Sequence, residues 1–379
     1  MTILPASAAD SARFRPEAVA RRLLAPDWTP TPPVRTLRLE APPVLAPDGS
    51  LLSVDGVTLK VRNPDGSPRW ELSVGQDVHP PVADADGQVY AATRSGRVIC
   101  LDGRSGALRW EKKYACVSHP PVLAGNRTVG LIVSDSGTRI ANLDARDGRQ
   151  RFSRDLPMFI LSRPPAGGPE GNLYVFNSND FRLHCFAPDG RNLWTAPIGD
   201  YAGAVSVGQD GTVLVPRMFG DVLALEPRQG KTLWSQRHGT STPYAAPDGQ
   251  GGAFVAAGNR LLHLEGSQGD TLWSTELPGP AASQPVQDGR GDLYLTTGEG
   301  VVAVDPEAGD PRALFRPSPS QGPPAGLPGQ GVVAAEPGGL VHELSVEDAP
   351  VEPAAAHRVE VQGNRVKVGA VSLPVRRVP

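Results

Sequence analysis

The sequence lacks the features that mark several large classes of protein. Its only cysteines are Cys100, Cys116 and Cys185, and their spacing offers neither a disulfide framework nor a Cys-x-x-Cys metal site. No apolar run reaches the roughly 18 residues of a membrane span, so no transmembrane helix is expected. The formal net charge is −3, which provides no basic field to attract nucleic acid.

Signals for catalysis and export are also missing. The sequence contains no phosphate-binding Walker loop, no Gly-x-Ser-x-Gly and no His-Glu-x-x-His. The first residues, MTILPASAADSARFRPEAVARRLLAP, hold no continuous apolar stretch like that of a secretory signal. We therefore expect a cytoplasmic protein.

Glycine and proline are abundant, with 43 and 40 residues among 379, and they recur at regular positions. Gly-x-x-x-Trp ends at Trp70, Trp110, Trp194, Trp234 and Trp273, and Gly148-x-x-x-Phe152 fills the one gap. These aromatic positions are 40, 42, 42, 40 and 39 residues apart. A fixed period of this length predicts a repeat architecture.

Each repeat follows one plan. It opens with a step such as Pro81-Val82 and passes an Asp-Gly turn into an apolar strand such as 88–92. A further turn and strand lead to Gly-x-x-x-Trp and a fourth strand, and such turns between apolar runs favour hairpins. Four short antiparallel strands in about 40 residues are typical of a β-propeller blade. Repeats starting near residues 41, 79, 119, 163, 203, 242, 283 and 322 predict eight blades, numbered 1 to 8 below.

The predicted fold is therefore an all-β, eight-bladed propeller of four-stranded antiparallel blades. Blade 8 lacks a Gly-x-x-x-Trp strand, and the alternating segment 34–40 is expected to complete it and close the ring. The expected domains are an N-terminal extension (1–33), the propeller (34–353) and a C-terminal tail with a hairpin (354–379). The extension is expected to contain a short helix at 16–24 and a Pro-rich tether, with the helix either docked on the propeller or binding a partner.

The repeated aromatic residues are predicted to have a structural role. One per blade would wedge against the next blade and lock the sheets together. Burial of ~200 Å² of aromatic surface stabilises by up to about 5 kcal/mol per blade. The residues assigned to this docking role are Trp70, Trp110, Phe152, Trp194, Trp234 and Trp273.

The pattern of aliphatic strand, Asp102-x-x-x-Gly106-x-x-x-Trp110 and Pro-Val restart resembles the pyrroloquinoline-quinone-type propeller superfamily over about residues 41–350. That group includes quinoprotein dehydrogenases and an outer-membrane assembly lipoprotein. The resemblance implies the fold and says little about chemistry.

Both known activities of the superfamily lack support in this sequence. The dehydrogenases usually carry an adjacent Cys-Cys pair, a Trp beneath the quinone and a calcium site, whereas this chain has no Cys-Cys, and Trp28 is its only Trp outside the docking series. The lipoprotein is lipidated on a cysteine after its signal, but no cysteine precedes Cys100. We therefore expect no catalytic residue, no cofactor and no metal, and we disfavour both of these roles.

The favoured hypothesis is a non-catalytic, monomeric scaffold that binds an unidentified protein partner through its blade-connecting loops. Exposed Met, Phe and Tyr side chains with a basic rim are the composition expected of such an interface. The candidate residues are His79, His119, Met158, Phe159, Arg163, Tyr201, Arg217, Met218 and Phe219.

Other interpretations stay open for these residues. Met158 and Phe159 could extend the core of their blade, and the two histidines could bind loop carbonyls. A metal held by both histidines would need a third ligand, for which no candidate is evident. The alternative functions are a small-ligand sensor that uses the central channel and a quinone-dependent oxidoreductase.

Overall fold

The computed structural model describes most of the propeller and a short C-terminal sheet. The described residues are 28, 30–31, 33, 35–38, 43–75, 77–125, 128–134, 137–156, 163–239, 241–316, 324–326, 331–335, 340–346, 359–362, 365–368 and 371–374. The predicted helix at 16–24 lies outside them. None of the described segments forms a helix long and apolar enough to cross a membrane.

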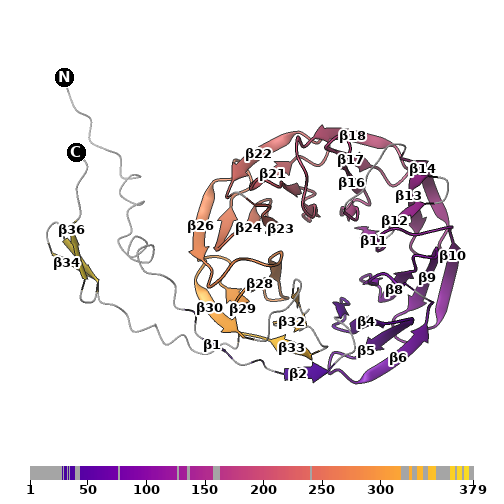
Figure 1. Cartoon of the computed structure of the whole chain (residues 1–379), viewed down its shortest axis with the longest axis horizontal. Helices are drawn as coiled ribbons and strands as arrows, with labels where there is room; N and C mark the ends of the chain where they lie inside the picture. Colours follow the sequence, from indigo (N-terminus) through magenta and orange to yellow (C-terminus); the bar gives the residue numbers. More distant parts are fainter. Residues whose placement is uncertain are drawn as a thin grey trace. The chain divides into compact units, whose positions relative to one another are not determined.

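Residues Trp28–Ser345 form one compact unit, a ring of eight antiparallel sheets (Figure 1). The predicted eight-bladed, all-β propeller is confirmed. Blade 1 contains β3 (Val44–Leu45), β4 (Leu51–Asp55), β5 (Thr58–Arg62) and β6 (Pro68–Ser73), and blade 2 contains β7 (Val82–Ala83), β8 (Gln88–Ala92), β9 (Arg97–Asp102) and β10 (Leu108–Lys113). Blade 3 contains β11 (Val122–Ala124), β12 (Thr128–Ser134), β13 (Thr138–Asp144) and β14 (Gln150–Asp155). Blade 4 contains β15 (Ala166–Gly167), β16 (Leu173–Asn177), β17 (Arg182–Phe186) and β18 (Asn192–Pro197).

The second half of the ring repeats this order, with the first strand of each blade innermost and the fourth on the outer rim (Figure 1). Blade 5 contains β19 (Ser206–Val207), β20 (Val213–Pro216), β21 (Asp221–Leu225) and β22 (Thr232–Arg237), and blade 6 contains β23 (Tyr244–Pro247), β24 (Ala253–Ala257), β25 (Arg260–Leu264) and β26 (Thr271–Glu276). Blade 7 contains β27 (Val286–Gln287), β28 (Leu293–Thr297), β29 (Gly300–Val304) and β30 (Pro311–Phe315). Blade 8 contains β31 (Ala325–Gly326), β32 (Val332–Ala335) and β33 (Leu340–Leu344).

An N-terminal strand closes the ring, as predicted. Strand β2 (Arg35–Arg38) pairs antiparallel with β33, with Arg35 opposite Glu343 and Arg38 opposite Leu340. Blade 8 thereby gains its fourth strand, which covers the edge that β33 would otherwise leave open.

A second N-terminal strand was not expected. Strand β1 (Pro30–Thr31) pairs in parallel with the outer edge of β30, so blade 7 has five strands. The half-buried Trp28 packs against the core between blades 6 and 7, and its indole N–H donates to the Glu276 carbonyl at 3.2 Å. Part of the segment that the sequence suggests as a tether is thus paired with a blade.

Neighbouring blades are joined through the repeated aromatic residues. The indole N–H of each Trp donates to a backbone carbonyl of the next blade at 2.7–3.0 Å, an interaction shared by Trp70, Trp110, Trp194, Trp234 and Trp273. The aromatic ring also packs on the Gly of the next repeat. At Gly148, which has a φ of +69°, an added Cβ would lie 2.7 Å from the Trp110 ring. Glycine is therefore required there both by the turn and by the approaching indole.

The C-terminal residues form a separate sheet. Strands β34 (Val359–Gln362), β35 (Arg365–Val368) and β36 (Val371–Pro374) pair antiparallel in that order. The two outer strands each contact the central strand, as in a three-stranded meander.

Candidate protein-binding face

One end of the propeller collects two kinds of loop: those between second and third strands, and those that connect one blade to the next. We call this end the loop face. Backbone bonds hold the two kinds of loop together. The Met218 N–H donates to the Tyr201 carbonyl at 3.0 Å, and the His238 N–H donates to the Gly220 carbonyl at 2.8 Å. A single residue in either loop is therefore positioned by two blades.

Three large apolar side chains protrude from the loop face at blades 4 and 5. Tyr201, Met218 and Phe219 are 45%, 42% and 58% exposed, and we call them the apolar patch. The isolated bridge between Ala202 and Arg217 brings their two loops together. A cluster of large apolar groups at one point of a surface is typical of a protein interface.

Ring packing and hydrogen bonds fix the residues next to the apolar patch. The Tyr201 ring meets Phe181 edge to face, with centroids 4.9 Å apart. Phe181 has a φ of +54°, which is uncommon for an aromatic residue and marks a tightly constrained turn. Arg217 donates to the Ile198 carbonyl at 3.1 Å and to the Asp221 carboxylate at 2.8 Å. The Arg217 charge is therefore neutralised within the turn, and its side chain links this turn to the loop that contains Ile198.

Phe181 and Tyr244 also belong to this region, although no sequence motif singles them out. Tyr244 is 38% exposed and lies two residues beyond Thr242, whose hydroxyl donates to the Met218 carbonyl at 3.5 Å. Position in the repeat could have identified Phe181, because it lies in the turn between the second and third strands of blade 4, as Phe219 does in blade 5.

At blades 2 and 3 the loop face has a different character. His79 is 5% exposed, and its Nε2 donates to the Val117 carbonyl at 2.9 Å. His119 is half-buried, and burial, assisted by the nearby His79 and Arg94 charges, lowers the pKa of its imidazole. His79 is thus inside the loop packing, so we leave it out of the binding surface proposed below.

The remaining sequence candidates divide into two groups. Arg163 is exposed at the start of blade 4. Met158 and Phe159 lie outside the described residues. The part of the chain that the structure describes brings no three His, Cys, Asp or Glu side chains together as a metal site. The absence of a metal and of a cofactor stays a prediction.

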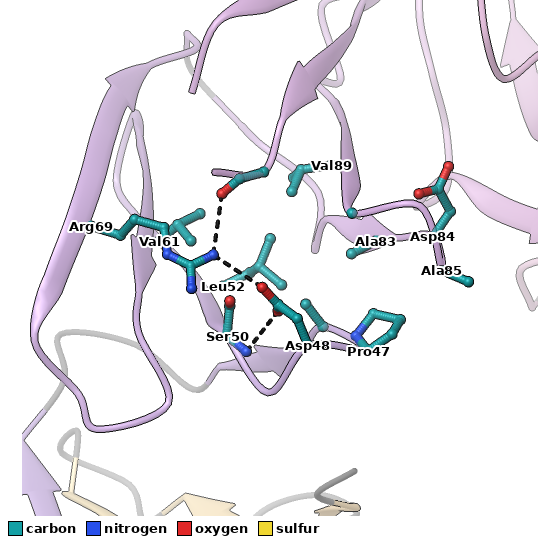
Figure 2. A pocket seen from close by; sticks show the side chains of 13 residues that line it. Pro47, Asp48, Ser50, Leu52, Val61, Arg69, Ala83, Asp84, Ala85 and Val89 are labelled. Carbon is teal, nitrogen blue, oxygen red and sulfur yellow. Dashed lines mark hydrogen bonds and ion pairs between the residues drawn. The ribbon is translucent and has the colours of Figure 1, made fainter. Parts of the chain in front are cut away.

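A pocket of about 150 Å³ lies between blades 1 and 2, at the end opposite the loop face. Figure 2 shows Arg69 crossing it, with its guanidinium donating to the Asp48 carboxylate at 3.1 Å and to the Gly103 carbonyl at 3.4 Å. The neighbouring Asp84 carboxylate accepts from the Tyr90 hydroxyl at 2.7 Å. These charged groups are engaged with the protein, so the pocket suits a role in blade packing.

The fold and repeats define an eight-bladed propeller of the pyrroloquinoline-quinone-like class. The sequence matches the family described as outer membrane protein assembly factor BamB over residues 54–200 and 179–314. The chain belongs to this family.

Individual relatives agree. The chain is 26% identical over 284 residues to outer membrane protein assembly factor BamB of Burkholderia pseudomallei, covering 68% of this chain and 72% of the relative. It is 27% identical over 328 residues to the Xanthomonas campestris protein of the same name, covering 65% and 80%. The crystal structure of BamB from Moraxella catarrhalis shares the fold with a TM-score of 0.59 and 18% identity, over 82% of this chain and 98% of that one. Quinohemoprotein alcohol dehydrogenase from Comamonas testosteroni also shares it, with a TM-score of 0.58 and 13% identity, over 83% and 76%.

These findings settle two expectations in opposite directions. The prediction of a non-catalytic propeller is confirmed, because the relatives are assembly factors. The prediction of a cytoplasmic protein is wrong, because the family is one of outer membrane protein assembly factors. Family membership also removes the argument against the lipoprotein's role. That argument and the location were both inferred from the first residues and the cysteine positions, whereas the family signal lies in the repeats.

Proposed function

We propose that this chain is a rigid scaffold in the assembly of outer membrane proteins and that it binds a protein partner through the apolar patch. Membership of the assembly-factor family supports the first part of the proposal. The clustering of Tyr201, Met218 and Phe219 on one braced pair of loops supports the second.

Exposure of Phe219 is the observation that carries the proposal. Its ring is 58% exposed, although the turn that presents it is fixed on both sides by backbone bonds to neighbouring loops. A rigid, exposed aromatic ring loses little conformational entropy on binding, and such residues dominate interface energetics. The chain's own packing makes little use of this side chain.

Co-purification from the native host tests the proposal. The full chain carrying Phe219→Asp is compared with the native chain and with Val57→Asp. Val57 is a matched control, since it is a 41% exposed apolar residue in the corresponding turn of blade 1. We expect Phe219→Asp to lose a stoichiometric protein partner that Val57→Asp retains. Retention of every partner by both variants would refute the apolar patch as the binding site.

A further inference from the structure

The outer rim carries a second surface feature, away from the loop face. In blades 1 to 7 the fourth strand contains one extra residue beside the docking position, a β-bulge in the pairing with the third strand. The bulge lies near the start of the fourth strand, so it belongs to the opposite end of each blade from the loop face. Its side chain changes character around the ring.

In one arc of the ring the bulge residue is arginine. Arg109 contacts the Asp102 carboxylate at 2.5 Å and Arg151 contacts Asp144 at 2.7 Å, and each aspartate lies seven residues earlier, at the last residue of the third strand. Arg312 makes the same pair with Asp305. In blade 1 Arg69 reaches Asp48 at 3.1 Å. In blades 7, 1, 2 and 3 the bulge residue is thus an arginine that forms an ion pair with an aspartate of the chain.

In the other arc the bulge residue is leucine. Leu193, Leu233 and Leu272 occupy the position in the consecutive blades 4, 5 and 6, and they are 43%, 43% and 57% exposed. We call these three residues the leucine arc. Their strands β18, β22 and β26 follow one another along the outer rim (Figure 1). Single exposed leucines are ordinary, whereas three at one register in successive blades place apolar groups at regular intervals along this part of the rim.

The turns between the third and fourth strands lie beside the leucine arc, and their side chains determine which binding partner fits it. The Gly of each turn packs on the Trp of the preceding blade, as Gly269 does on Trp234 and Gly309 on Trp273. The turn of blade 6 therefore lies beside the Leu233 strand, and the turn of blade 7 lies beside the Leu272 strand.

Carboxylates dominate the Leu272 end of the arc. Glu265 and Asp270 belong to the turn of blade 6, and Glu307 belongs to the turn of blade 7. The Glu265 carboxylate accepts the backbone N–H groups of Ser267 and Gln268, which lowers its pKa and keeps it ionised. Within the described ranges, none of these three acids forms an ion pair with a cationic side chain. The blade 5 turn instead carries Arg228 and Lys231 beside Glu226, so the excess negative charge lies in the turns of blades 6 and 7, which flank Leu272.

We propose that the leucine arc binds a protein segment that combines aliphatic side chains with lysine or arginine, the basic residues lying over Leu272. The leucines would supply apolar burial, and the carboxylates would set orientation through complementary charge. An anionic membrane surface is disfavoured as occupant, because the same carboxylates would repel it. This surface is distinct from the apolar patch and does not depend on it.

Photo-crosslinking in the native host tests this proposal. Benzoylphenylalanine replaces Leu233 or Leu272 in the full chain, and it replaces Leu108 as the control. Leu108 is 53% exposed on the outer strand of blade 2, where it neighbours the closed Arg109–Asp102 pair. We expect positions 233 and 272 to crosslink the same protein through a segment rich in aliphatic and basic residues, and position 108 to give no such product.

Charge reversal then tests the orientation. The variant Asp270→Lys with Glu307→Lys should reduce the crosslink from position 272 at least fivefold, while thermal unfolding shows the fold retained. Equal crosslinking with and without the reversal would overturn the proposal, as would products from all three positions or crosslinks only within the chain itself. Flotation of the purified protein with phosphatidylglycerol vesicles, lost on Leu272→Lys, would also overturn it in favour of a lipid surface.

Discussion

The loop face at blades 4 and 5 and the loop face at blades 2 and 3 use the same repeat positions for different purposes. At blades 4 and 5, Tyr201, Met218 and Phe219 project into solvent from braced turns. At blades 2 and 3, His79 is buried and its ring ties one loop to the next through the Val117 carbonyl. One region of the face is therefore available to a partner, and the other serves the fold.

Both regions lie on blades that are joined to their neighbours by the same kind of buried Trp. Removal of such a Trp gives the largest expected effect on stability. Trp110→Ala and Trp194→Ala each remove a buried indole and its bond to the next blade. We expect each to lower the free energy of unfolding by about 3–5 kcal/mol. Denaturant titration of the two variants measures this loss. A large cost at only one of them would show that the two regions differ already in blade docking.

Loss of the His79 ring should weaken the fold and leave partner binding intact. In His79→Leu the Val117 carbonyl loses its buried donor, which we expect to cost about 1–3 kcal/mol of stability. Chemical denaturation checks the stability, and co-purification checks the partner. Loss of the partner from a fully folded His79→Leu variant would contradict the division of the face.

Tyr201→Ala should show the reverse behaviour. Its ring packs on Phe181 but is 45% exposed, so we expect little change in melting temperature. Affinity for the partner should fall by about 1–2 kcal/mol, roughly five- to thirtyfold, as is usual for an interface aromatic. Calorimetry with the purified partner measures the change, and Val57→Ala serves as the control on the same face.

The smallest effect concerns pH. Burial lowers the pKa of His119 in the folded chain below its ordinary value of 6.5, so the unfolded chain binds the proton more readily. Stability associated with His119 is therefore full above that value and decreases as the pH falls through it. His119→Gln should flatten the loss of stability between about pH 7 and about pH 5, measured by thermal unfolding at each pH. A steeper loss in the variant would contradict this sign.

Much of the architecture follows from the sequence, because the repeat makes it visible many times. The period of Gly-x-x-x-Trp predicts the blades, and the alternation at 34–40 predicts the closing strand, which the structure places at Arg35–Arg38. The short parallel strand Pro30–Thr31 was not predictable, since two residues in a Pro-rich stretch carry no alternation. Its position is determined by Trp28 and the free edge of β30.

The candidate site was less predictable than the fold. Position along the repeat placed Tyr201, Met218 and Phe219 on the loop face, where the structure shows them exposed, but it treated His79 as equivalent to them. Burial of His79 depends on the path of a neighbouring loop through Val117, and no local pattern encodes that path. The leucine arc was missed for a related reason: exposed and buried leucines look alike until the bulge beside each Trp is seen.

The most direct test of the central claim is the dissociation constant of the purified partner for the native chain and for Phe219→Asp, with melting temperatures recorded beside it. The scaffold proposal predicts at least tenfold weaker binding by Phe219→Asp, an unchanged melting temperature, and native affinity for Val57→Asp. Equal affinity of all three proteins would contradict the claim that the apolar patch holds the partner.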